Sequence, residues 1–124
     1  MVTHYVPPIS VTSQRLILDN EKLRRANAKV TTATAYKYGD LLTLSDTNVL
    51  AHATDEKTWD VICGQDVSAA EATIKAADGI EIPVYYGGVF NVEAVSLGGT
   101  LLTTAQYDAA RAKATKNKIE LSKV

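Results

Sequence analysis

Apolar and polar residues alternate most regularly between Ile80 and Val95, in the stretch IEIPVYYGGVFNVEAV. Such alternation predicts strands that bury one face. Gly87 and Gly88 predict a reversal within the stretch, because glycine tolerates the backbone of a tight turn. A two-residue loop would place polar residues opposite apolar ones, whereas a loop from Tyr86 to Gly88 gathers the apolar residues on one face. We therefore expect a hairpin with a three-residue loop and Gly88 in a left-handed conformation.

Other apolar stretches predict further strands. Two short runs, Leu41–Ser45 and Val49–Ala53, flank a turn-forming Asp-Thr-Asn sequence and predict a second hairpin. The apolar run Trp59–Val67 predicts a central strand, and Lys118–Ser122 predicts a final strand with alternate residues facing inward. The β-branched and aromatic residues of Val30–Tyr38 favour an extended segment that leads into the domain. The chain is therefore expected to be mainly β (α+β), a small domain of antiparallel hairpins.

Two stretches predict helices. The best candidate is the alanine-rich stretch Thr103–Ala114, which opens with a capping box between Thr103 and Gln106. Asn117 lies where a left-handed residue would end this C-terminal helix. A second candidate runs from Ala69 to Ala77 and is stopped by Gly79, although two β-branched residues within it also suit a strand.

The first 28 residues do not show the pattern of a core element. Their apolar residues are dispersed, and the pair Pro7-Pro8 enforces an extended backbone. We interpret residues 1–28 as an extended N-terminal arm that orders on a partner, and residues 29–124 as a β-rich domain. The alternative is a tail without a role, but the arm contains more apolar and aromatic residues than simple tails carry.

Length, composition and charge exclude several classes of function. The 124 residues suit one domain, and 46% hydrophobic and 22% charged residues are typical of a soluble globular protein. The formal net charge of −1 gives no reason to expect binding to nucleic acid or to an acidic membrane surface. No apolar run approaches the roughly 20 residues that span a bilayer.

The sequence offers little catalytic or metal-binding chemistry. The only histidines are His4, in the arm, and His52, which we interpret as a surface or interface residue. The single cysteine, Cys63, has apolar neighbours and is expected to be buried and unreactive. One cysteine and two distant histidines cannot form a zinc site. We therefore expect no enzyme activity, no metal and no cofactor.

Five aspartates recur through the first half of the chain, and they support a different hypothesis. Asp40, Asp46, Asp55, Asp60 and Asp66 match no calcium-binding loop, and most lie beside turn residues, where aspartate bonds to the local backbone. The alternative is a small ligand-binding or enzymatic module that uses clustered aspartates. It predicts a pocket that gathers at least two of Asp40, Asp60 and Asp66.

Several segments stand in a characteristic order along the chain. They are the start Thr3-His4-Tyr5 followed by Pro7, the segment LLTLSDTNVLAHAT at Leu41–Thr54, the strand VICGQDVSA at Val61–Ala69, the segment IPVYYGGVFNVEAV at Ile82–Val95, and the closing helix and strand. Together they resemble the lambda-type head decoration proteins of tailed bacteriophages, a family of small capsid-stabilising proteins. The chain departs from the family by extra length at Ala69–Gly79 and by a charged stretch at Asn20–Lys29.

This resemblance implies a fold, a partner and a location. The family has a β-clip fold and binds as a homotrimer to the outside of the expanded phage head, at three-fold and quasi-three-fold positions. Its N-terminal arm adds to a sheet of the major capsid protein, so Thr3, His4, Tyr5 and Pro7 become candidate capsid contacts. The protein would be made in the host cytoplasm and reside on the outer surface of the virion. A general oligomeric interaction module outside any virus would share the same fold.

Overall fold

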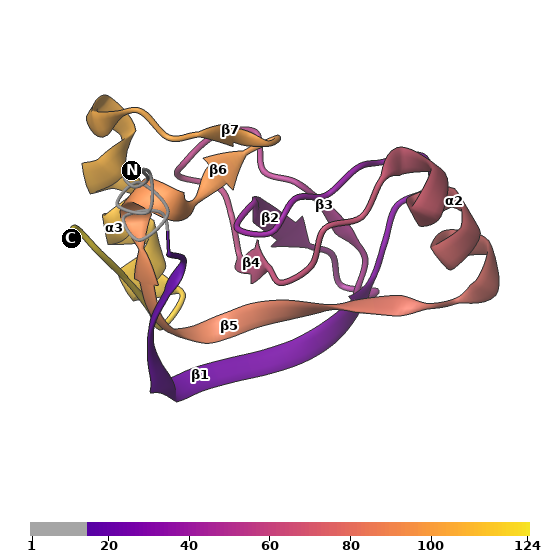
Figure 1. Cartoon of the computed structure of the whole chain (residues 1–124), viewed down its shortest axis with the longest axis horizontal. Coiled ribbons are helices and arrows are strands. Elements are labelled where there is room, and N and C mark those ends of the chain that lie inside the picture. The colour runs from indigo at the N-terminus through magenta and orange to yellow at the C-terminus, as the bar shows by residue number, and fades with distance from the viewer. Residues whose placement is uncertain (1–14) are drawn as a thin grey trace, which may run out of the picture.

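The structure is a computed structural model, and it describes residues 15–124. These residues form a mainly β fold with two helices, which confirms the predicted class (Figure 1). In chain order the elements are β1 (Ile17–Lys29), β2 (Leu41–Leu44), β3 (Leu50–His52), β4 (Val61–Cys63), α2 (Ala69–Asp78), β5 (Glu81–Asn91), the 3-10 helix η1 (Val92–Ala94), β6 (Ser96–Leu97), β7 (Thr100–Leu101), α3 (Thr104–Lys116) and β8 (Ile119–Ser122). Within residues 15–124, no helix is long and apolar enough to cross a membrane.

The main sheet is organised around β5. Its strands follow the order β1-β5-β4-β2-β3 with antiparallel neighbours. β8 pairs in parallel with residues 88–91 of β5, beyond the residues of β5 that pair with β4. A parallel bridge between Lys29 and Val49 joins the end of β1 to the residue before β3, so the two ends of the sheet meet. β6 and β7 form a separate small hairpin that lies against the sheet (Figure 1).

The predicted hairpin at Ile80–Val95 is wrong. β5 passes straight through Gly87 and Gly88 as one strand of 11 residues and pairs with β1. A Cβ atom on Gly87 would lie 3.1 Å from the side chain of Arg24, and one on Gly88 would lie 3.1 Å from the ring of Phe90. The glycines therefore provide room for β1 and for Phe90 rather than a turn. Gly88 has a positive φ of +132°, outside the left-handed helical region expected of it.

The tight glycine turn lies elsewhere. Gly98 and Gly99, with φ values of +58° and +86°, join β6 to β7. Positive φ at both central residues is what a two-residue hairpin of type I′ requires. The sequence contains two Gly-Gly pairs, and only the surrounding tertiary structure distinguishes the turn from the strand.

The predicted arm also requires correction. Ile17–Lys29 is the strand β1 of the main sheet, and Leu16 and Ala28 are buried in the core, so the body begins near residue 16 rather than 29. Most side chains of β1 are exposed, because the strand joins the sheet through backbone hydrogen bonds and buries few apolar groups. This is why its sequence lacks the pattern of a core element. The rest of the predicted arm lies outside the described residues.

Other predicted elements are confirmed, with shorter bounds for the strands. β2 and β3 form the second hairpin, and β4 is a central strand between β5 and β2. β8 buries Ile119 and Leu121 as expected. The segment Val30–Tyr38 forms only an isolated bridge, between Tyr36 and Val67.

Both predicted helices are present. α2 starts at the N-cap residue Ser68 and ends at Gly79, whose φ of +69° is left-handed. At the start of α3, the Gln106 side chain accepts a hydrogen bond from the Thr103 N–H at 2.8 Å. The end of α3 differs from the prediction, because Asn117 has a φ of −87° and Lys118 takes the positive value of +67°.

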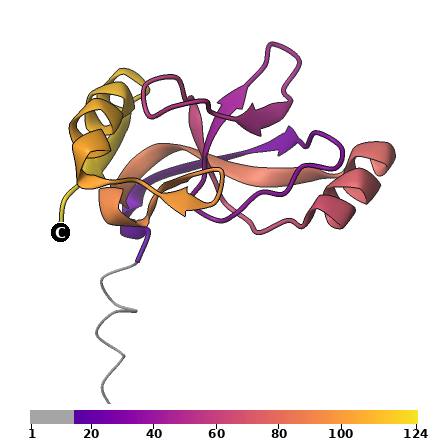
Figure 2. The ribbon, with the colours of Figure 1, turned by 90° about the horizontal axis from the view of Figure 1, so that it is seen from above.

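The core consists of two clusters of buried side chains on the sheet. One cluster includes Trp59 and Phe90 and is covered by Ala110 and Ala114 of α3. The other includes Leu42 and Ile82 together with Ala72 of α2. The helices therefore cover opposite ends of the sheet, as Figures 1 and 2 show, and β1 runs between these ends.

Candidate functional site

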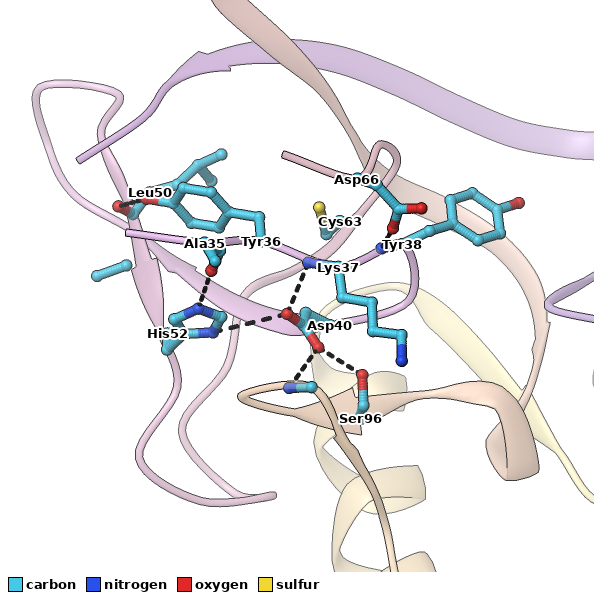
Figure 3. Close-up of polar contacts among 12 residues, drawn as sticks. Ala35, Tyr36, Lys37, Tyr38, Asp40, Leu50, His52, Cys63, Asp66 and Ser96 are labelled. Atoms are coloured by element: carbon cyan, nitrogen blue, oxygen red, sulfur yellow. Dashed lines mark hydrogen bonds and ion pairs between the residues drawn. The ribbon is translucent and has the colours of Figure 1, made fainter. Parts of the chain in front are cut away.

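The most connected polar group of the body is Asp40, which is buried at the start of β2 with 1% of its surface exposed. Its Oδ2 accepts a hydrogen bond from the Lys37 N–H at 2.9 Å (Figure 3). Its Oδ1 accepts one from the Ser96 hydroxyl and one from the Gly99 N–H at 3.0 Å. A buried carboxylate is stable only when such donors replace water. Asp40 therefore fastens the β6–β7 hairpin to the main sheet.

His52 of β3 lies beside this carboxylate. Its Nε2 donates to the Ala35 carbonyl at 2.7 Å, and its ring stacks on Tyr36 with 5.3 Å between the ring centroids. Its Nδ1 is buried, lies 3.8 Å from Asp40 Oδ2 and has no hydrogen-bond partner among the described residues (Figure 3). The side chain is 28% exposed, so His52 is a partly buried residue fixed by its neighbours rather than an open surface residue.

Ser96, Asp40 and His52 are the residue types of a nucleophilic triad, but their order is different. In a triad, the serine hydroxyl donates to the histidine, and the carboxylate orients that histidine from its other side. Here the Ser96 hydroxyl donates directly to Asp40. Among the described residues, His52 therefore makes no hydrogen bond to Ser96, and the arrangement is that of a polar network that joins the hairpin to the sheet. Sequence analysis missed the roles of Ser96 and Tyr36, because their partners are distant in sequence; Ser96, for example, lies 56 residues from Asp40.

Tyr36 secures the outer edge of β3. Its hydroxyl donates to the Leu50 carbonyl at 2.9 Å and accepts a hydrogen bond from the Thr31 N–H at 2.9 Å. The Thr31 hydroxyl donates to the same Leu50 carbonyl at 2.8 Å. The outward carbonyl of Leu50 is therefore satisfied within the chain, by two hydroxyl groups.

The aspartates bind separate parts of the local backbone. Asp60 accepts a hydrogen bond from the Leu44 N–H at 2.9 Å, and Asp66 accepts one from the Tyr38 N–H at 2.7 Å. Asp40 serves the separate network described above. Within residues 15–124, no group of three or more His, Cys, Asp or Glu side chains is placed to hold a metal ion. Each of the three carboxylates thus accepts hydrogen bonds from a different part of the backbone, and the hypothesis of a pocket that gathers at least two of them stays a prediction.

A cavity of about 850 Å³ lies between β1, β5 and the turn that joins α3 to β8. Charged side chains of both signs line it, namely Lys22, Arg24, Lys118, Glu21 and Glu120, together with apolar Leu23 and Ile119 and backbone at residues 87–89. None of the aspartates considered above lines it. It is an open groove beside the edge strand, with more positive than negative side chains.

Two groups that could act as nucleophiles are held in their protonated forms. Burial raises the pKa of the Cys63 thiol to about 11. Burial and a hydrogen bond with Tyr85 raise the pKa of Tyr38 to about 12. A thiol or phenol is a strong nucleophile only when it is deprotonated, so neither group is activated at neutral pH.

We expect Cys63 of the folded protein to resist alkylation at pH 8. Its side chain is fully buried, and its Sγ donates to the Gln65 carbonyl at 3.0 Å. Mass spectrometry after treatment with iodoacetamide should detect almost no adduct in buffer and complete modification in 6 M guanidinium chloride. Equal rates of alkylation in the two solutions would contradict the buried position.

The candidate capsid contacts Thr3, His4, Tyr5 and Pro7 lie outside the described residues. The described chain begins next to the end of β5, where the Leu16 carbonyl accepts a hydrogen bond from the Asn91 N–H at 2.8 Å. A scan against protein-family models and a search of curated proteins found no match to this chain. The functional assignment therefore rests on the segments quoted above and on the geometry of the body.

Proposed function

We propose that this protein decorates and stabilises the outer surface of a tailed-phage head. It binds the expanded shell as trimers at three-fold and quasi-three-fold positions, and its partner is the major capsid protein. The observation that carries the proposal is the placement of the segments that resemble the decoration family. Leu41–Thr54 spans the β2–β3 hairpin, Val61–Ala69 contains β4, and Ile82–Val95 contains most of β5. The resembling segments thus belong to one connected sheet.

The position of β1 supports a role for the residues that precede it. β1 is an end strand of the sheet, and it begins at Ile17, ten residues after Pro7, the last of the candidate contacts Thr3, His4, Tyr5 and Pro7. In this proposal, that stretch adds to a sheet of the capsid protein, because strand addition gains backbone hydrogen bonds with little demand on sequence. Many trimers that bind only the expanded lattice then stabilise it by mass action against the pressure of packaged DNA.

Deletion of residues 1–8 tests the proposal. The core described above is formed by residues 16–121, so the truncated protein should unfold at the same temperature as the full chain. It should lose binding to empty expanded heads assembled from the cognate capsid protein, measured by co-sedimentation. A matched control replaces residues 1–8 by a Gly-Ser sequence of equal length. Undiminished binding of the truncated protein would refute the role of these residues, and absence of binding by the full chain would refute the proposed function.

A further inference from the structure

The side of β1 that faces away from β5 is covered at its C-terminal end. The Asn48 side chain donates to the Asn27 carbonyl at 3.1 Å, and the Lys29 N–H donates to the Asn48 carbonyl at 2.9 Å. Asn48 lies in the turn between β2 and β3 and has a φ of +66°. A turn, rather than a strand, therefore bonds to the backbone at this end of β1.

The N-terminal half of β1 is irregular. From Arg25 to Lys29, β1 pairs residue by residue with β5, but the register shifts on both sides of Arg24. The largest shift lies between Asp19 and Arg24, where β1 advances five residues while β5 advances only two, from Val89 to Gly87. The three additional residues form a bulge in β1, which we call the β1 bulge.

Contacts at both ends fix the shape of the β1 bulge. At its start, the Asp19 side chain accepts a hydrogen bond from the Glu21 N–H at 2.8 Å, which is the local bond of an Asx turn. At its end, Leu23 is half-buried and packs against the core cluster that includes Phe90. A Cβ atom on Gly88 would lie 3.2 Å from Leu23 Cδ1, so Leu23 approaches the sheet closely. The β1 bulge is therefore part of the packed fold.

The backbone of the β1 bulge does not present the pattern that an added strand requires. A strand that joins a sheet bonds to N–H and C=O groups that alternate in direction from residue to residue. A bulge disrupts this alternation and bends the strand. The exposed side chains do not select a partner by charge, because Asp19 and Glu21 lie beside Lys22 and Arg24. The geometry of the backbone, rather than charge, therefore decides what this edge can bind.

We propose that the β1 bulge, together with Asn48, ends the sheet at β1 and prevents a further strand from pairing with it. A regular end strand exposes a row of backbone donors and acceptors to which strands of other molecules can add, and proteins block such edges with bulges and covering loops. Here the bulge interrupts one half of the strand, and the turn that contains Asn48 covers the other end. This inference does not rest on the function proposed above.

Shortening of β1 tests the proposal. Deletion of Asn20–Lys22 removes as many residues as the β1 bulge adds, so that Leu23 and Arg24 can pair in register with Gly88 and Gly87. The shortened protein should self-associate, and its average molar mass at high protein concentration should exceed that of the unaltered protein at least about twofold. The matched control Asn20→Ser/Glu21→Ser/Lys22→Ser removes the same side chains but keeps the length of the bulge, and it should behave as the unaltered protein does. Multi-angle light scattering measures the masses.

Hydrogen exchange locates the contact. In the shortened protein, the amides of residues 19 and 23–26 should gain protection as the protein concentration rises, whereas in the unaltered protein the protection of residues 19–26 should stay constant. A folded shortened protein that does not associate would overturn the proposal, and so would association of the serine control. If circular dichroism shows that the shortened protein does not fold, the unaltered protein decides: constant protection at residues 19–26 supports the proposal, and a gain with concentration overturns it.

Discussion

The substitution Phe90→Ala is expected to lower the free energy of unfolding by about 3–5 kcal/mol. Phe90 is fully buried at the point where three strands meet, since it pairs with Ile17 of β1 and with Leu121 of β8. Its ring packs against Tyr85 with 5.4 Å between centroids. Alanine would leave a cavity that the surrounding strands cannot close, because the main-chain ladders fix their separation.

Equilibrium unfolding in urea measures this effect. The single tryptophan, Trp59, is fully buried in the same cluster, so its fluorescence reports unfolding of the core. The control Tyr86→Ala removes an aromatic ring of similar size from the same strand, but that ring is 44% exposed, and the loss should be below about 1.5 kcal/mol. Equal losses for Phe90→Ala and Tyr86→Ala would contradict the buried position assigned to Phe90.

The substitution Asp40→Ala is expected to cost about 3–4 kcal/mol, because it removes the acceptor of several buried donors at once. The Lys37 N–H, the Ser96 hydroxyl and the Gly99 N–H would all lose their partner. Water can replace the carboxylate only in part, since the site is enclosed by the β6–β7 hairpin. The loss should be accompanied by faster hydrogen exchange in residues 96–101.

Asp66→Ala is the matched control for Asp40→Ala. Asp66 is exposed and accepts a single hydrogen bond, from the Tyr38 N–H, so its replacement should cost less than about 1 kcal/mol. Thermal and urea unfolding of the two variants side by side give the comparison. If Asp40→Ala proves no more destabilising than Asp66→Ala, then Asp40 does not hold the hairpin to the sheet.

Local signals in the sequence were sufficient for several elements. The β2–β3 hairpin was predictable because its turn residues and its apolar runs are adjacent in sequence. α2 and α3 were predictable because the residues that cap their N-termini lie within one turn of the helix. In each case, the interactions that define the element occur within about 12 residues of one another.

The features that were missed depend on partners far away in the sequence. Whether Gly87 and Gly88 form a turn or a strand is decided by Arg24 and Leu23, which approach them from β1. β1 resembles an arm in sequence because it joins the sheet through its backbone and buries few of its side chains, which leaves no apolar pattern. The network of Asp40 likewise joins residues on three separate segments. Pattern analysis of a single sequence does not detect such pairings.

The long ladder between β1 and β5 has a mechanical consequence. A force applied to the start of β1 along the strand axis would act in shear. It would strain the backbone hydrogen bonds between β1 and β5 together, rather than breaking them one after another. At the far end of β1, the Asn48 side chain donates to the Asn27 carbonyl at 3.1 Å and the Lys29 N–H donates to the Asn48 carbonyl at 2.9 Å, which adds resistance there. Tension transmitted through the residues that precede β1 would therefore be spread over the sheet rather than concentrated on one hydrogen bond.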